Sequence, residues 1–178
     1  MQTPPKSEDP KKPAAKAQPI PEMIGATEAP FVVEKDQTHI SLVLHAPRGP
    51  ALVRGPALPG VARTDGSTVR IILRVENITG TEMVPDLNLY LNLPKGEPAD
   101  KHPELLAGRL PLFGLAESSS GEDGQTGNGL FHALDITAVY GRLLRDNDWD
   151  GKSLRVSFVP TLPNSSKVRV GRVSVYIA

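Results

Sequence analysis

The strongest constraint in this sequence is a repeated alternation of apolar and polar residues with a period of two. It is clearest over residues 86–93, where every second position is leucine: Leu87, Leu89, Leu91 and Leu93. The positions between them are Asp86, Asn88, Tyr90 and Asn92. Successive side chains of a strand point to opposite faces of a sheet. This segment therefore predicts a strand with one buried and one wetter face, as antiparallel sheets usually have.

The same alternation predicts further strands along the chain. They cover residues 38–45, 69–75, 152–159 and 167–177, with weaker candidates at 105–113 and 129–134. In the last strand the apolar face changes between Val170 and Val173, which predicts a β-bulge at Gly171–Arg172. The regular spacing of these strands favours a sheet structure throughout the folded part.

One segment has helical spacing instead. Within residues 135–146 the apolar positions are Ile136, Val139, Tyr140, Leu143 and Leu144. That spacing places them on one face of a helix. The segment 114–128, rich in Ser, Gly and acidic residues, is predicted as a long unstructured loop. The pattern predicts an all-β fold: an antiparallel β-sandwich or jelly-roll-like domain with one short helix.

The first residues have a different composition. Residues 1–22 alternate prolines with lysines and small residues, and such a segment cannot bury enough apolar surface to fold. We predict a disordered tail or linker over 1–22 and a β-sandwich accessory domain over 23–178. The tail lacks the apolar stretch of a secretory signal, so a separately encoded chain is expected in the cytoplasm.

The overall composition excludes several classes of function. Lys plus Arg equals Asp plus Glu, 20 against 20, so there is no electrostatic reason for binding nucleic acid or an anionic membrane. The chain has no cysteine, which excludes a thiolate metal site and a cysteine nucleophile. No apolar run approaches the ~20 residues that span a bilayer.

The histidines do not form a metal-binding pattern. His39 and His45 lie on one predicted strand, roughly 20 Å apart at ~3.3 Å per residue. His102 and His132 stand in other segments, and no pair has the spacing of metal ligands on a helix. No serine lies in a nucleophile elbow. We therefore predict no catalytic residue, no metal ligand and no bound cofactor in this chain.

Several segments resemble the C-terminal domain of the tyrosinase and polyphenol oxidase family, the type-3 copper oxidases. They are Pro21–Thr27, Asp86–Pro94, Leu130–Thr137, Trp149–Asp150, Leu154–Pro160 and Gly171–Tyr176. The first is similar to the linker that leaves the copper domain. The second is similar to a strand that ends in Tyr-x-Asn. Their order and spacing extend the resemblance over nearly the whole folded part.

The resemblance implies a non-catalytic companion of a copper-binding domain. In the family two copper ions are each held by three histidines, whereas this chain has four histidines in total. The implied role is a lid that covers the copper-site entrance and restrains phenol and diphenol oxidation. The partner would be a tyrosinase-like catalytic domain, in cis or in trans.

The resemblance also implies that a side chain of the lid enters the substrate pocket. Phe113 and Phe131 flank the long loop and, with His132, are the candidates for a pocket-plugging or partner-contact role. Val43 and Ile72 are apolar on otherwise polar strand faces, so they are candidates for an interface. The alternative function is an independent β-sandwich module that binds protein or carbohydrate, because sandwiches host many functions.

Overall fold

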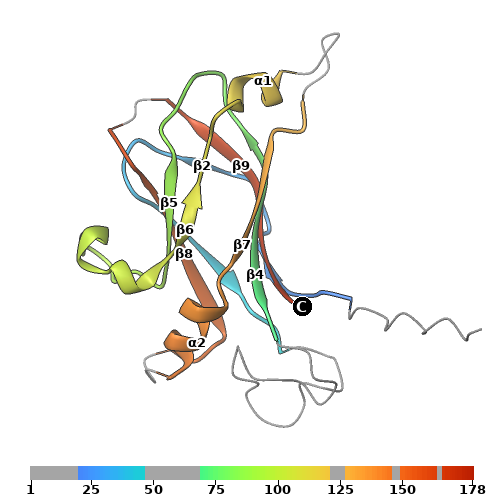
Figure 1. Cartoon of the computed structure of the whole chain (residues 1–178), viewed down its shortest axis with the longest axis vertical. Helices are drawn as coiled ribbons and strands as arrows, with labels where there is room; N and C mark the ends of the chain where they lie inside the picture. The colour runs from blue at the N-terminus through green and yellow to red at the C-terminus, as the bar shows by residue number, and fades with distance from the viewer. Residues whose placement is uncertain (1–19, 47–68, 121–126, 146–148, 164–165) are drawn as a thin grey trace, which may run out of the picture.

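The computed structural model describes residues 20–46, 69–120, 127–145, 149–163 and 166–178. Its strands are β1 (Glu22–Ala26), β2 (Phe31–Val33), β3 (Thr38–Val43), β4 (Ile71–Thr79), β5 (Leu87–Leu91), β6 (Leu106–Leu110), β7 (Leu130–Asp135), β8 (Ser153–Pro160) and β9 (Val168–Ile177). The helices are α1 (Leu115–Ser119) and α2 (Thr137–Arg145), with short 3₁₀ turns η1 (Ala99–Lys101) and η2 (Pro103–Leu105) (Figure 1).

The strands form two antiparallel sheets. The first has the order β1-β9-β4-β7, with β2 also paired to β9, and the second has the order β3-β8-β5-β6. β1 pairs with one end of β9 and β2 with the other, so these two short strands share one edge. The predicted all-β sandwich is confirmed.

One core lies between the two sheets. The first sheet contributes Leu73 and Val175, and the second contributes Leu89, Leu154 and Phe158, all fully buried. These are positions that the alternation placed on inward faces. Each such side chain contributes about 1.5–3 kcal/mol by leaving water. The predicted helix is confirmed as α2, and Asp135 Oδ1 accepts the backbone N–H of Thr137 at its start (3.0 Å).

The segment at the predicted domain boundary folds as a strand. Residues up to 19, most of the predicted tail, lie outside the described part of the chain, and β1 begins at Glu22. β1 pairs with β9, with a register shift between Met23 and Gly25. Ile24 is buried. The sequence did not predict this strand because its apolar residues are too few to alternate.

The phase change predicted in the last strand is confirmed, but its structural cause lies in β4. β4 and β9 keep one continuous register on both sides of the facing pair Asn77 and Gly171. The register shift is instead between β4 and β7, where β4 carries the extra residue between Val75 and Ile78. Asn77 adopts a φ of 53°. Both paired strands therefore change faces together, and the bulge predicted in β9 is wrong in position.

The predicted loop 114–128 is helical at its start. α1 begins after Gly114, whose φ is 76°, and its Leu115 is buried. Residues 121–126 of this loop lie outside the described residues. The prediction of a single helix is therefore wrong, because one buried leucine in a five-residue helix leaves no periodic pattern.

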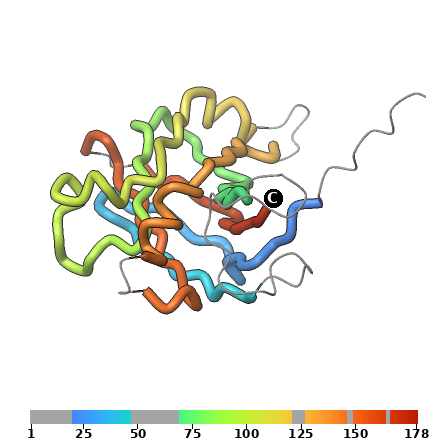
Figure 2. The backbone as a smooth tube through the Cα atoms, turned by 60° about the horizontal axis from the view of Figure 1, so that its bottom comes forward, coloured from blue at the N-terminus to red at the C-terminus, as the bar shows by residue number. Residues whose placement is uncertain are grey.

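The second sheet is also covered on its outer side. Residues 94–105, here called the β5–β6 flap, include η1 and η2 and protrude from the side of the sandwich (yellow-green in Figures 1 and 2). Tyr90, Leu93 and Ala99 form a small second core with Leu105 and Val159. Tyr90, which the alternation placed on the wetter face, is therefore buried.

Candidate functional site

The most exposed aromatic side chain in the described part is Phe113, in the turn between β6 and α1. Its side chain is 93% exposed, and so is that of Met83 in the loop between β4 and β5. Both line one groove of about 320 Å³, together with Val84, Leu115 and Glu117. We call Met83, Phe113 and this groove the Phe113 tip. Exposed apolar side chains that gather on one surface mark an interaction site more often than scattered ones do.

Buried neighbours hold Phe113 outward. Leu112 and Leu115, on either side of the turn, are both buried in the main core. Between them Gly114 takes a left-handed conformation with a φ of 76°. The turn is therefore anchored at both ends, and the phenyl ring between the two leucines lies outside the core.

A carboxylate ties this turn to the second sheet. Asp86 Oδ1 accepts a hydrogen bond from the backbone N–H of Leu112 (3.1 Å), and Asp86 Oδ2 lies 2.9 Å from Nε of Arg109. The backbone carbonyl of Asp86 accepts the N–H of Thr161 (2.9 Å). Since Asp86 directly precedes β5, the position of Phe113 is coupled to the sheet.

The other side of the tip is tied through α1. Ser119 Oγ accepts the backbone N–H of Gly80 (2.9 Å) and donates to the carbonyl of Leu115 (2.6 Å). A Cβ on Gly80 would lie 2.7 Å from a methyl carbon of Leu115. This close contact holds the loop that carries Met83 against α1. The Phe113 tip is thus a projecting apolar surface whose backbone is held by the hydrogen bonds of Asp86 and Ser119.

The structure separates Phe131 and His132. As neighbours on β7 they point to opposite faces: Phe131 is 55% exposed, and His132 pairs with the buried Val75. His132 Nε2 is buried without a hydrogen-bond partner in the described part. Phe131 therefore presents a second exposed phenyl ring, while His132 does not share its surface.

Val43 and Ile72 also lie apart. Val43 is 63% exposed on β3, an edge strand of the second sheet, and lines a groove of about 700 Å³ with Met23 and Phe31. Ile72 is partly buried on β4 of the first sheet, paired with Tyr176. Met83 could not be identified from the sequence, since no pattern relates it to Phe113.

The histidines do not fit a copper centre. Nδ1 of His39 is hydrogen-bonded to the buried Ser157 (2.8 Å), and both ring nitrogens of His102 contact carboxylates. Among the described residues, no three His, Cys, Asp or Glu side chains stand where they could hold one metal ion. Within the described ranges, no helix combines the length and apolarity that crossing a membrane requires.

Comparison with known proteins shows similarity to tyrosinases and polyphenol oxidases. The chain is 30% identical over 166 residues to the tyrosinase HcTyr1 of Hahella sp. (strain CCB-MM4), which covers 92% of this chain and 34% of that protein. The fold is similar to part of latent apple tyrosinase (MdPPO1), with a TM-score of 0.50 and 14% identity over 85% of this chain and 28% of that chain.

A recombinant latent aurone synthase (polyphenol oxidase) also has a similar fold. Its TM-score is 0.50 with 12% identity, over 83% of this chain and 25% of that chain. This chain thus spans about a third or less of the length of these relatives. The predicted resemblance to C-terminal domains of tyrosinases and polyphenol oxidases is confirmed. A family model matches residues 20–178, and the chain belongs to that family, described as Domain of unknown function (DUF7868).

Proposed function

We propose that this domain is a non-catalytic accessory domain of a tyrosinase-like copper oxidase, which covers the copper-site entrance and restrains phenol and diphenol oxidation. The two copper ions would belong to the catalytic partner domain, joined in cis or binding in trans. The similarity to a tyrosinase over 92% of this chain supports the association. The solved relatives with a similar fold are described as latent, which supports a restraining role.

The observation that carries the proposal is the Phe113 tip. Phe113 is 93% exposed on a turn that is anchored at both ends, so its backbone has little conformational freedom left to lose when the ring enters a pocket. An apolar ring in the substrate pocket excludes phenols by occupying the same space. Because ring and substrate compete, the restraint depends on how tightly the domain binds.

The test measures diphenol oxidation by a copper domain of a tyrosinase, for example that of the Hahella relative, with increasing amounts of this chain. We expect the wild-type chain to inhibit. Phe113→Ala is expected to inhibit about 10- to 100-fold less strongly, as loss of a central aromatic anchor usually does. Leu162→Ala is the matched control, because Leu162 is 66% exposed on the turn between β8 and β9.

Parallel measurement of Phe131→Ala separates the two candidate rings. A loss of inhibition with Phe131→Ala alone would move the plug to β7 and would contradict the Phe113 proposal. If the wild-type chain neither inhibits nor co-elutes with the copper domain, the lid role itself is wrong.

Carbohydrate binding as an independent module has less support. Carbohydrate sites usually offer exposed aromatic rings, but Trp149 stacks edge-on against Tyr140 with ring centroids 5.0 Å apart. Arg74 covers the ring of Tyr176 at 4.3 Å, and Tyr90 is buried. These aromatic side chains are already occupied by contacts within the domain.

A further inference from the structure

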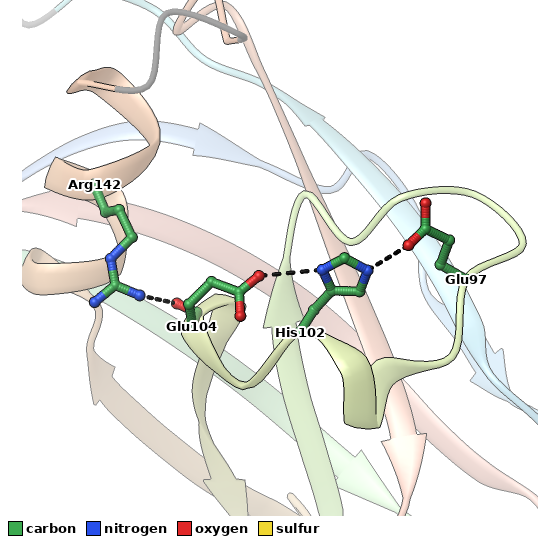
Figure 3. Close-up of polar contacts among 4 residues, drawn as sticks. All are labelled: Glu97, His102, Glu104 and Arg142. Atoms are coloured by element: carbon green, nitrogen blue, oxygen red, sulfur yellow. Dashed lines mark hydrogen bonds and ion pairs between the residues drawn. The ribbon is translucent and has the colours of Figure 1, made fainter.

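The β5–β6 flap contains a histidine held between two carboxylates. His102 Nε2 lies 2.6 Å from Oε2 of Glu97, and His102 Nδ1 lies 3.1 Å from Oε1 of Glu104 (Figure 3). The two glutamates come from opposite ends of the flap. The His102 side chain is 19% exposed, whereas Glu97 and Glu104 are 53% and 44% exposed, so water reaches both carboxylates.

This geometry requires a doubly protonated ring. Carboxylates only accept hydrogen bonds, and a neutral imidazole has one N–H to donate. Only the imidazolium can donate to both glutamates. The pKa of His102 is accordingly raised above its ordinary 6.5, first by the hydrogen bond to Glu97 and then by that to Glu104.

One of the two glutamates is fixed to the rest of the domain. The backbone carbonyl of Glu104 accepts a hydrogen bond from Nη1 of Arg142 on α2 (2.9 Å). His102 therefore links the Glu97 end of the flap to a segment that is tied to a helix. In Figure 3 the chain Arg142, Glu104, His102 and Glu97 is continuous.

Other charged groups near the flap do not replace this link. Lys95, Asp100 and Lys101 belong to the flap itself and are exposed. On the sheet beneath, the pKa of His39 is lowered by burial first, and then by the charges of Arg155 and Lys95. A proton on His39 is therefore unfavourable, whereas a proton on His102 is favoured by its two glutamate partners.

We infer that the protonation state of His102 controls the β5–β6 flap. The His102 imidazolium keeps the flap closed over Tyr90 and Leu93, and loss of its proton loosens the flap. The apolar surface that would then meet solvent is the second core on the outer side of the second sheet. This inference is independent of the proposed lid function.

The direction with pH follows from the geometry. With the flap open, His102 has its ordinary pKa near 6.5, and with the flap closed its pKa is higher. While both glutamates are ionised, the proton therefore stabilises the closed flap fully below pH about 6.5, and this contribution disappears as the pH rises through the higher value. Each unit of pKa difference changes the closing equilibrium about tenfold.

The test uses NMR of the whole chain. The nitrogen shifts of the His102 ring report its protonation, and hydrogen exchange reports opening at two flap amides, His102 bonded to the Ala99 carbonyl and Leu105 bonded to the His102 carbonyl (both 3.1 Å). After correction for intrinsic exchange, we expect flap protection to fall at least about fivefold as His102 loses its proton. The amide of Ala178, which donates to the carbonyl of Arg70 (2.9 Å) just beyond the paired ends of β4 and β9, is the internal reference.

Two variants sharpen the result. In Glu97→Gln the new amide can donate an N–H to the neutral ring, so the loss of flap protection at high pH should shrink while the fold remains. In His102→Gln the flap amides should show weak protection at every pH. His45→Gln changes an exposed histidine and should behave as wild type. Flap protection that follows the Ala178 reference at every pH, or an unchanged pH response in Glu97→Gln, would overturn the inference.

Discussion

The carboxylate of Asp86 lies 3.1 Å from the backbone nitrogen of Leu112. Asp86 directly precedes β5, and Leu112 lies in the turn that follows the neighbouring strand β6. This contact determines where Phe113, the next residue, is presented. It joins segments that are distant in the sequence but adjacent in the second sheet, where β5 and β6 pair.

Removing this carboxylate should loosen the turn. Asp86→Ala leaves the Leu112 N–H without its acceptor, and we expect the free energy of unfolding to fall by about 1–3 kcal/mol in urea denaturation. Asp86→Asn keeps an acceptor oxygen and should lose less. Arg109→Ala should cost about 1 kcal/mol or less, because the Arg109 side chain is 61% exposed and its ion pair is screened by water. Equal stability of Asp86→Ala and wild type would mean that Leu112 has another acceptor.

The pair Asn77 and Gly171 should show strong coupling. A Cβ on Gly171 would lie 2.7 Å from Cβ of Asn77, so Gly171→Ala is expected to cost about 1–3 kcal/mol of stability. Asn77→Gly removes the opposing Cβ and suits the φ of 53° at that position. The double variant should therefore recover most of the loss, as thermal or urea unfolding would detect. Additive effects of the two substitutions would show that the two side chains do not collide.

Among core substitutions, truncation of the largest buried aromatic ring should reduce the stability of the domain most. Phe158 is fully buried and lies against Phe31, with ring centroids 5.4 Å apart. We expect Phe158→Ala to destabilise the domain by about 3–5 kcal/mol, through lost burial and the cavity that remains. Val43→Ala, at an exposed position, should change stability by no more than about 0.5 kcal/mol. A small effect of Phe158→Ala would require the two sheets to close the cavity.

His39 should make the domain less stable in acid. Its pKa in the folded chain is lowered below the ordinary 6.5, by burial first and then by Arg155 and Lys95. As the pH falls below 6.5 the unfolded chain binds this proton more readily, so the free energy of unfolding decreases. We expect the free energy of unfolding in urea to decrease more for wild type than for His39→Gln when the pH is lowered from 7.5 to 5. A constant difference would contradict the lowered pKa.

The strands with regular alternation could be predicted from the amino-acid sequence alone, and so could the helix α2 and the scattering of the histidines. Each of these depends on the spacing of residues along one segment, since a period of two or 3.6 is a local property of the backbone. The inward positions of Leu89, Leu154 and Phe158 were therefore predictable before any pairing was known.

Which segments of the chain meet in space could not be predicted from the sequence and became known from the folded structure. It places Met83 beside Phe113, buries Tyr90 beneath the flap, brings Glu97 to His102, and aligns Asn77 with Gly171. None of these contacts has a period or a motif, because each joins a loop or a strand end to another element. Such contacts depend on sheet order and register, which the packing of the whole chain sets and no single segment encodes.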